Sequence, residues 1–121
     1  MKSNHPFSTR LKAARLAKAA ELKARGLGGY SQERLGCDTG IEEATASARM
    51  NQYEQGKHLP DLPQAIRFAE ALDVPLAYLF CLDDDIANLL VSLHNLPTSR
   101  RLELTKQFQV LADAEHPQRD S

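Results

Sequence analysis

The chain has 121 residues, of which 42% are hydrophobic and 26% are charged, and its formal net charge is −1. This length allows one domain, or a small domain with an appendage, of ordinary globular composition. It shows no apolar run long enough to span a membrane and no charged and then apolar leader, which argues against a membrane protein or an exported one.

The first predicted helix runs to about Arg25. Ser8 or Thr9 can cap it, and Ala, Leu, Lys and Arg, which favour helices, continue it. A glycine-rich connection follows and leads to Tyr30. The apolar positions fall near one face of this helix, namely Phe7, Leu11, Ala14 and Leu22.

The segment 31–60 predicts two short helices joined by a tight turn at Gly40. Ser31 can accept a hydrogen bond from a free backbone N–H at the start of the first helix, and the acids that follow suit the positive end of its dipole. Leu35 and Ile41 flank the turn and are expected to pack it. Glycine adopts the backbone angle of such a turn at a lower cost than other residues.

The second helix of this pair combines an apolar seam with a polar face. Its short polar side chains, Thr45, Ser47, Arg49, Asn51 and Gln52, are interleaved with Ala44, Ala46, Ala48, Met50 and Tyr53. Arginine, amide and hydroxyl side chains are the types that hydrogen-bond to base edges in the major groove. The pattern therefore indicates a helix-turn-helix and points to DNA binding.

Further helices are predicted up to residue 114, which makes the chain all-α. Asp61 can cap a helix that ends at Leu72, and residues 76–80 form a short helix that fills the core. Acids at 83–85 open a helix over 84–96, and Thr98 can cap a last one over 98–114. The sequence shows no strand-like alternation and no internal repeat.

Charge is divided unevenly between the two halves of the chain. Residues 1–60 contain ten Lys and Arg against six Asp and Glu, a balance of +4, whereas residues 61–121 have a balance of −5. The local potential, rather than the total charge, governs attraction to phosphates. The half with the helix-turn-helix is thus the one suited to DNA.

Five motifs occur in order along about Phe7 to Phe80. They are Arg10-Leu11-Lys12-Ala13-Ala14-Arg15, Ser31-Gln32-Glu33-Arg34-Leu35, Gly40-Ile41, Tyr53-Glu54-Gln55-Gly56-Lys57 with Pro60, and Leu72 to Phe80. Together they resemble the Cro/repressor-type helix-turn-helix family, also called xenobiotic-response-element-like regulators. The resemblance implies a compact five-helix domain whose second helix crosses the DNA backbone and whose third enters the major groove.

The chain departs from the family in two places. The connection before Ser31 is longer than usual, and Gly40 and Glu54 are fourteen residues apart where the family has about ten. The recognition helix therefore begins a turn earlier, or a short separate helix occupies residues 42–45.

This insertion leaves two registers for the base-reading residues. Counting forward from Gly40 gives Glu43, Ala44, Thr45 and Ser47, and counting back from Glu54 and Gly56 gives Ser47, Ala48, Arg49, Asn51 and Gln52. We favour the second, because Glu42 and Glu43 would meet phosphates badly. In that register Arg49 can bind guanine, and Asn51 or Gln52 can bind adenine. The alternative for these residues is a solvated helix face.

Residues around the two helices have positioning or structural roles. The resemblance places Gln32 on a phosphate or an adjacent base, and Ser31 and Lys57 are further phosphate candidates. Tyr53 is expected to face the core and Glu54 to pair with a basic residue of the first helix such as Arg15, while Gly56 turns the chain. His58 could also hold a phosphate, but we favour an exposed loop residue.

Other kinds of site find no support in the sequence. The four histidines and the two cysteines, Cys37 and Cys81, do not have the spacing of metal ligands, so we expect no metal and no cofactor. We expect the two thiols to be reduced and at least partly buried, in a cytoplasmic protein. Asp83, Asp84 and Asp85 suit a helix start. No phosphate-binding glycine loop or catalytic arrangement appears, so an enzyme is not expected.

The predicted organisation has four parts: an arm over 1–6, a DNA-binding domain over 7–82, a helical hairpin over 83–114 and a tail over 115–121. The apolar stripes of the hairpin either pack back onto the domain or join a second copy in a homodimer, which we favour. We expect a repressor that binds double-stranded operator DNA, with an antitoxin or a mobile-element controller as further possibilities within this class. The rival hypothesis is a protein-interaction module that kept the helix-turn-helix shape without DNA affinity.

Overall fold

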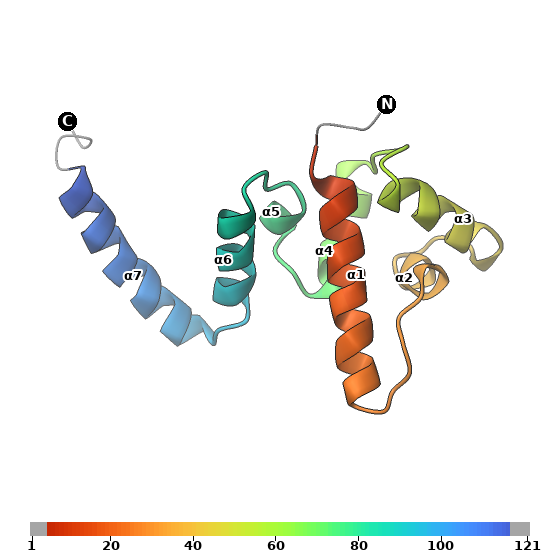
Figure 1. The fold of residues 1–121 in the computed structure, drawn as a ribbon, viewed down its shortest axis with the longest axis horizontal. Coiled ribbons are helices and arrows are strands. Elements are labelled where there is room, and N and C mark those ends of the chain that lie inside the picture. Colours follow the sequence, from red (N-terminus) through yellow and green to blue (C-terminus); the bar gives the residue numbers. More distant parts are fainter. Residues whose placement is uncertain (1–4, 117–121) are drawn as a thin grey trace.

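The computed structural model describes residues 5–116, and within this range the chain folds entirely into helices and contains no strand (Figure 1). The predicted all-α class is confirmed for this range. In chain order the helices are α1 (Phe7–Ala24), α2 (Gln32–Asp38), α3 (Glu43–Glu54), α4 (Leu62–Leu72), α5 (Leu76–Leu79), α6 (Asp84–His94) and α7 (Thr98–Glu115). No helix among the described residues is long and apolar enough to cross a bilayer.

Two of the predicted helix caps are confirmed. The Ser31 hydroxyl accepts a hydrogen bond from the Arg34 backbone N–H at 3.0 Å, and the Asp61 carboxylate accepts one from the Gln64 N–H at 2.9 Å. Each satisfies a backbone donor that has no partner inside its own helix. These caps fix the starts of α2 and α4.

The predicted caps of the first and last helices are wrong. Ser8 lies inside α1, which begins at Phe7 after Pro6, and Thr98 is the first residue of α7, after Pro97. Neither proline provides a side-chain cap. A proline has no N–H of its own to satisfy and its φ suits a helix start. As a result, α1 begins two positions earlier than a Ser8 cap would place it, and α7 begins one position earlier than a Thr98 cap would place it.

The hydrophobic core lies between α1, α2, α3, α4 and α5. Phe7 is buried at its centre, where its ring centroid lies 6.2 Å from that of Phe68 and 5.4 Å from that of Phe80. Tyr53 packs edge-on against Phe68 at 5.5 Å, and its predicted inward orientation is confirmed. The largest fully buried side chains are Phe7, Leu11, Leu35, Met50, Phe68 and Leu79.

The helices α2 and α3 pack at a very short distance because a glycine lies between them. A Cβ atom on Gly36 would lie 2.9 Å from the Cβ of Ala46 and 3.1 Å from the Cγ of Met50. The predicted turn between the two helices is confirmed, with Gly40 at a φ of +93° and Ile41 buried. This packing fixes the orientation of α3 against α2.

The two C-terminal helices differ in how they contact the domain. Ala87 of α6 is buried in the core, and Arg10 of α1 binds the Cys81 carbonyl oxygen at 3.0 and 3.1 Å and the Asp84 carboxylate at 2.9 Å. In contrast, α7 contributes no buried residue and extends away from the other helices (Figure 1). Of the two C-terminal helices, only α6 therefore packs back onto the domain. Most of the predicted arm 1–6 and tail 115–121 lies outside the described residues.

Candidate nucleic-acid interface

The insertion before Glu54 extends α3 at its N-terminal end. A single uninterrupted helix covers Glu43–Glu54, so the alternative of a separate short helix over residues 42–45 is wrong. Ala46, Met50 and Tyr53 face the core at spacings of four and three residues, which keeps one side of α3 buried over its whole length. The side opposite to them faces solvent.

The exposed side of α3 is a continuous polar surface with small residues at its middle. Thr45 and Gln52 are seven residues apart and lie on the same side of the helix, as do Ala44 and Asn51. Ala48 lies between these pairs, and all five are exposed. Ala44 and Ala48, each included among the base-reading residues of one register, therefore lie on the exposed side of α3. Because their side chains are small, a duplex can approach the helix backbone closely.

The exposure of the side chains does not decide between the two sets of base-reading residues that the sequence allows. Glu43, Thr45 and Ser47 of the first register are exposed, and so are Ser47, Ala48, Arg49, Asn51 and Gln52 of the second. Ser47 and Arg49 lie at the two edges of the surface, one on the α2 side and the other on the α4 side.

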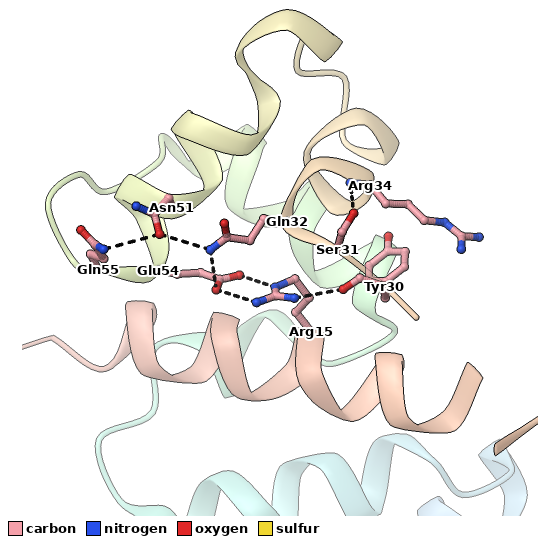
Figure 2. A network of polar contacts seen from close by, with 8 residues as sticks. All are labelled: Arg15, Tyr30, Ser31, Gln32, Arg34, Asn51, Glu54 and Gln55. Carbon is pink, nitrogen blue, oxygen red and sulfur yellow. Dashed lines mark hydrogen bonds and ion pairs between the residues drawn. The ribbon is translucent and has the colours of Figure 1, made fainter. Parts of the chain in front are cut away.

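A buried ion pair joins the C-terminal end of α3 to α1, as Figure 2 shows. The Arg15 guanidinium donates to both carboxylate oxygens of Glu54, at 2.6 and 3.0 Å, and the Glu54 side chain is only 2% exposed. Arg15 also binds the Tyr30 carbonyl oxygen at 3.0 Å. The sequence prediction that Glu54 pairs with Arg15 is confirmed. A bidentate pair of this kind restricts the orientation of both side chains.

Gln32 extends this network to the exposed face of α3. Its side-chain amide nitrogen donates to a Glu54 carboxylate oxygen at 3.1 Å and to the side-chain amide oxygen of Asn51 at 3.4 Å, and the Gln55 side chain donates to the same Asn51 oxygen at 3.5 Å (Figure 2). The amide oxygen of Asn51 is therefore directed at Gln32 and Gln55, while its amide nitrogen points away from them. The involvement of Gln55 was not predicted, since its position is typical of any exposed residue at a helix end.

The two residues proposed for phosphate contact on either side of α3 differ in their surroundings. Ser31 is exposed and its oxygen accepts the capping bond from Arg34, which leaves the hydroxyl proton for an outside acceptor. Lys57 is exposed beyond the end of α3, where its backbone N–H binds the Gln52 carbonyl oxygen at 3.0 Å. The predicted turn at Gly56 is confirmed by its φ of +77°.

The start of α2 is anchored by Tyr30, which is buried against basic side chains. Its ring lies 4.4 Å from the Lys18 ammonium nitrogen and 5.3 Å from the Arg34 guanidinium carbon, and its hydroxyl donates to Asp38 at 2.6 Å. Burial, followed by the hydrogen bond and the charge of Asp38, raises the pKa of the Tyr30 phenol well above its ordinary value. The phenol is therefore neutral and acts as a hydrogen-bond donor at neutral pH.

A cavity of about 460 Å³ opens between α3 and α4, beside the exposed face of α3. The Arg49 guanidinium lines it and donates to the Tyr53 hydroxyl at 3.3 Å, and Arg67 lines it from α4. Arg67 was not among the predicted site residues, because the sequence alone does not show which exposed side chain of α4 faces α3. The cavity lining also includes Thr39, Gly40, Ile41, Leu59, Pro60, Asp61 and Gln64.

Other side chains of the described range do not assemble a further site. No group of three or more His, Cys, Asp or Glu residues there is placed to hold a metal ion. Cys37 is exposed, so the expectation that both thiols are at least partly buried is wrong for it, whereas Cys81 is half-buried.

The exposed surface of α3 is open to a large partner. In Figure 1, α3 lies on one side of α1, and α6 and α7 lie on the other. The C-terminal helices therefore do not cover Thr45, Asn51 or Gln52, which are exposed. This arrangement leaves space for a nucleic acid along α3.

A solved structure is similar to this chain over most of its length. It is described as the crystal structure of transcriptional regulator BswR, and it matches with a TM-score of 0.76 and 40% sequence identity over 89% of this chain and 97% of that chain. The chain belongs to the family of the transcriptional regulator BswR. No protein-family model and no curated protein sequence matches the chain.

Proposed function

We propose that this chain is a Cro/repressor-type helix-turn-helix regulator that binds a near-palindromic operator as a homodimer and represses transcription. Its membership of the BswR family supports a role in transcription. The simplest mechanism of repression is steric, because a dimer seated on a promoter excludes polymerase. An enzymatic role has no positive support among the described residues.

The observation that carries the proposal is that the outer face of α3 is exposed while the helix itself is held in place by the Arg15–Glu54 pair. Asn51 and Gln52 are exposed near the C-terminal end of this face, and Glu54 of the same helix binds Arg15 of α1. A side chain reads a base only if its own helix is held still, since each bidentate base contact depends on correct geometry. The Arg15–Glu54 pair supplies this rigidity.

In the proposed complex α3 enters the major groove and its neighbours bind the backbone. Asn51 or Gln52 binds adenine, and Ala48 packs close to the base edges. Ser31 and Lys57 lie beyond opposite ends of the α2–α3 unit and bind phosphates. The complete proposed contact surface is Ser31, Gln32, Thr45, Ser47, Ala48, Arg49, Asn51, Gln52 and Lys57.

The proposed homodimer forms through α7 and the outer side of α6. Phe108 and Leu111 lie on one face of α7, with exposed fractions of 62% and 67%. On α6, Ile86 and Leu89 are 47% and 50% exposed. An 18-residue helix with no buried residue is marginally stable in water unless its apolar side is covered, and a second copy provides the matching apolar surface. Half-sites about 34 Å apart, one DNA turn, would then bind one dimer.

Two variants of α7 test the dimer. Phe108→Glu places a charge in the proposed interface, whereas Val110→Glu places the same charge on the opposite face of the helix, where Val110 is 70% exposed. Sedimentation equilibrium is expected to show a monomer for the first variant and a dimer for the second. Equal masses for the two variants would contradict the proposed interface.

Selection from random duplexes tests the function itself. The proposal predicts enrichment of an inverted repeat, with affinity that falls steeply as the salt concentration rises. Recovery of no enriched sequence at low salt would favour the rival hypothesis, a protein-interaction module with a helix-turn-helix shape.

A further inference from the structure

We propose that the cavity between α3 and α4 binds a phosphate of the DNA backbone through Arg49 and Arg67. This inference rests on the proposed DNA binding and assigns Arg49 to the backbone instead of guanine. It also adds Arg67 of α4, which the sequence did not single out. The two arginines line the same cavity, which is large enough, at about 460 Å³, for a phosphate with the adjoining sugar.

Both arginines are held in place by neutral groups. The Tyr53 hydroxyl accepts a hydrogen bond from Arg49 at 3.3 Å, and the Gln64 side-chain oxygen accepts one from the Arg67 Nε at 2.9 Å. Gln64 is itself fixed, because it is buried and its amide nitrogen donates to the Thr39 hydroxyl at 2.9 Å. The guanidinium groups are therefore oriented before any ligand arrives, which lowers the entropic cost of binding.

The charges of the two guanidinium groups are not neutralised within the described part of the chain. Every ion pair in that range involves other basic residues, and neither Arg49 nor Arg67 has a carboxylate oxygen within 4.0 Å. One acid, Asp61, does line the cavity, but its carboxylate accepts the capping bond from the Gln64 backbone N–H. The cavity thus retains a net positive charge and a planar donor geometry that matches phosphate oxygens.

The position of the cavity also fits a backbone phosphate. It adjoins the α4 side of α3, whereas Ser31 and Gln32 lie on the α2 side. When α3 occupies a major groove about 12 Å wide, the two phosphate backbones flank it, one on each side. The Tyr53 hydroxyl, which accepts from Arg49, keeps its own proton and can donate it to a phosphate oxygen.

The test compares Arg67→Gln with Arg25→Gln in the full chain, on the selected duplex and on a mutated one. Arg25 is the control, since it is 62% exposed and follows the C-terminal end of α1, away from α3 (Figure 1). Arg67→Gln is expected to weaken binding to both duplexes roughly tenfold, without changing the preference between them, and to reduce the slope of log affinity against log salt by about 0.9. Arg25→Gln is expected to change neither quantity.

Single methylphosphonate replacements along the duplex identify the contacted phosphate. At that phosphate the neutral group is expected to weaken binding of the unaltered protein roughly tenfold but to have little further effect on Arg67→Gln. If Arg67→Gln binds with unchanged affinity and salt slope, this inference is overturned while the proposed function stands. The same conclusion would follow if Arg49→Ala lost its preference at one base pair, since Arg49 would then contact a base. Absence of any duplex binding by the unaltered protein would overturn both.

Discussion

Replacing Glu54 by alanine is expected to destabilise the domain strongly. The carboxylate is 2% exposed and binds Arg15 through two hydrogen bonds, at 2.6 and 3.0 Å, and Gln32 through a third. Its removal leaves the Arg15 guanidinium, only 12% exposed, without its counter-charge. Breaking a buried pair by deleting one partner costs about 3–5 kcal/mol. Glu54 lies at the C-terminal end of α3, where the dipole disfavours a negative charge, so we expect a loss near the lower end, about 3 kcal/mol.

The exposed pair Arg100–Glu103 provides the control for this measurement. Its side chains are 54% and 56% exposed, so Glu103→Ala is expected to change the free energy of unfolding by less than about 1 kcal/mol. Urea denaturation followed by circular dichroism at one protein concentration measures both variants. The argument would be refuted by a Glu54→Ala variant that loses no more stability than Glu103→Ala.

Three further predictions concern the packing of α2, the pH dependence of stability and the role of α3. Gly36→Ala should lower the free energy of unfolding by about 1–3 kcal/mol, although alanine favours helices, because its Cβ would lie 2.9 Å from that of Ala46; a more stable variant would contradict this. Burial raises the pKa of Tyr30 in the folded state, so the neutral phenol is favoured there and stability should fall as the pH rises above about 10. Urea midpoints should show a shallower fall for Tyr30→Phe, and an equally steep one would count against this cause. In binding titrations Asn51→Ala should relax preference at one base pair at a cost of about 1–3 kcal/mol, whereas Lys57→Ala should weaken all sequences alike, and equal effects would argue against the proposed roles.

Local features of the domain could be predicted from the sequence because each has a short-range physical cause. The turn at Gly40 requires a positive φ, and the caps at Ser31 and Asp61 require an acceptor beside free backbone N–H groups. The Arg15–Glu54 pair is a longer-range contact, but the family resemblance brought the first and third helices together. Charge complementarity then selected the two partners.

Features that depend on how the helices are rotated could not be predicted. The sequence alone does not show which alanines of α3 are buried: Ala46 packs against α2 together with Met50, whereas Ala48 faces outward. Arg67 occupies an unremarkable polar position in α4, and only the tertiary packing brings it to the same cavity as Arg49. Packing against the core likewise distinguishes α6, which buries Ala87, from α7, which buries no residue.

The central claim is that the open face of α3 contacts DNA, and mapping of the interface by nuclear magnetic resonance tests it most directly. On addition of the selected duplex, the side-chain amide signals of Asn51 and Gln52 and the backbone signals of residues 44–52 are expected to shift, while those of α7 stay unchanged. Shifts confined to α6 and α7, with the signals of α3 unmoved, would contradict the account.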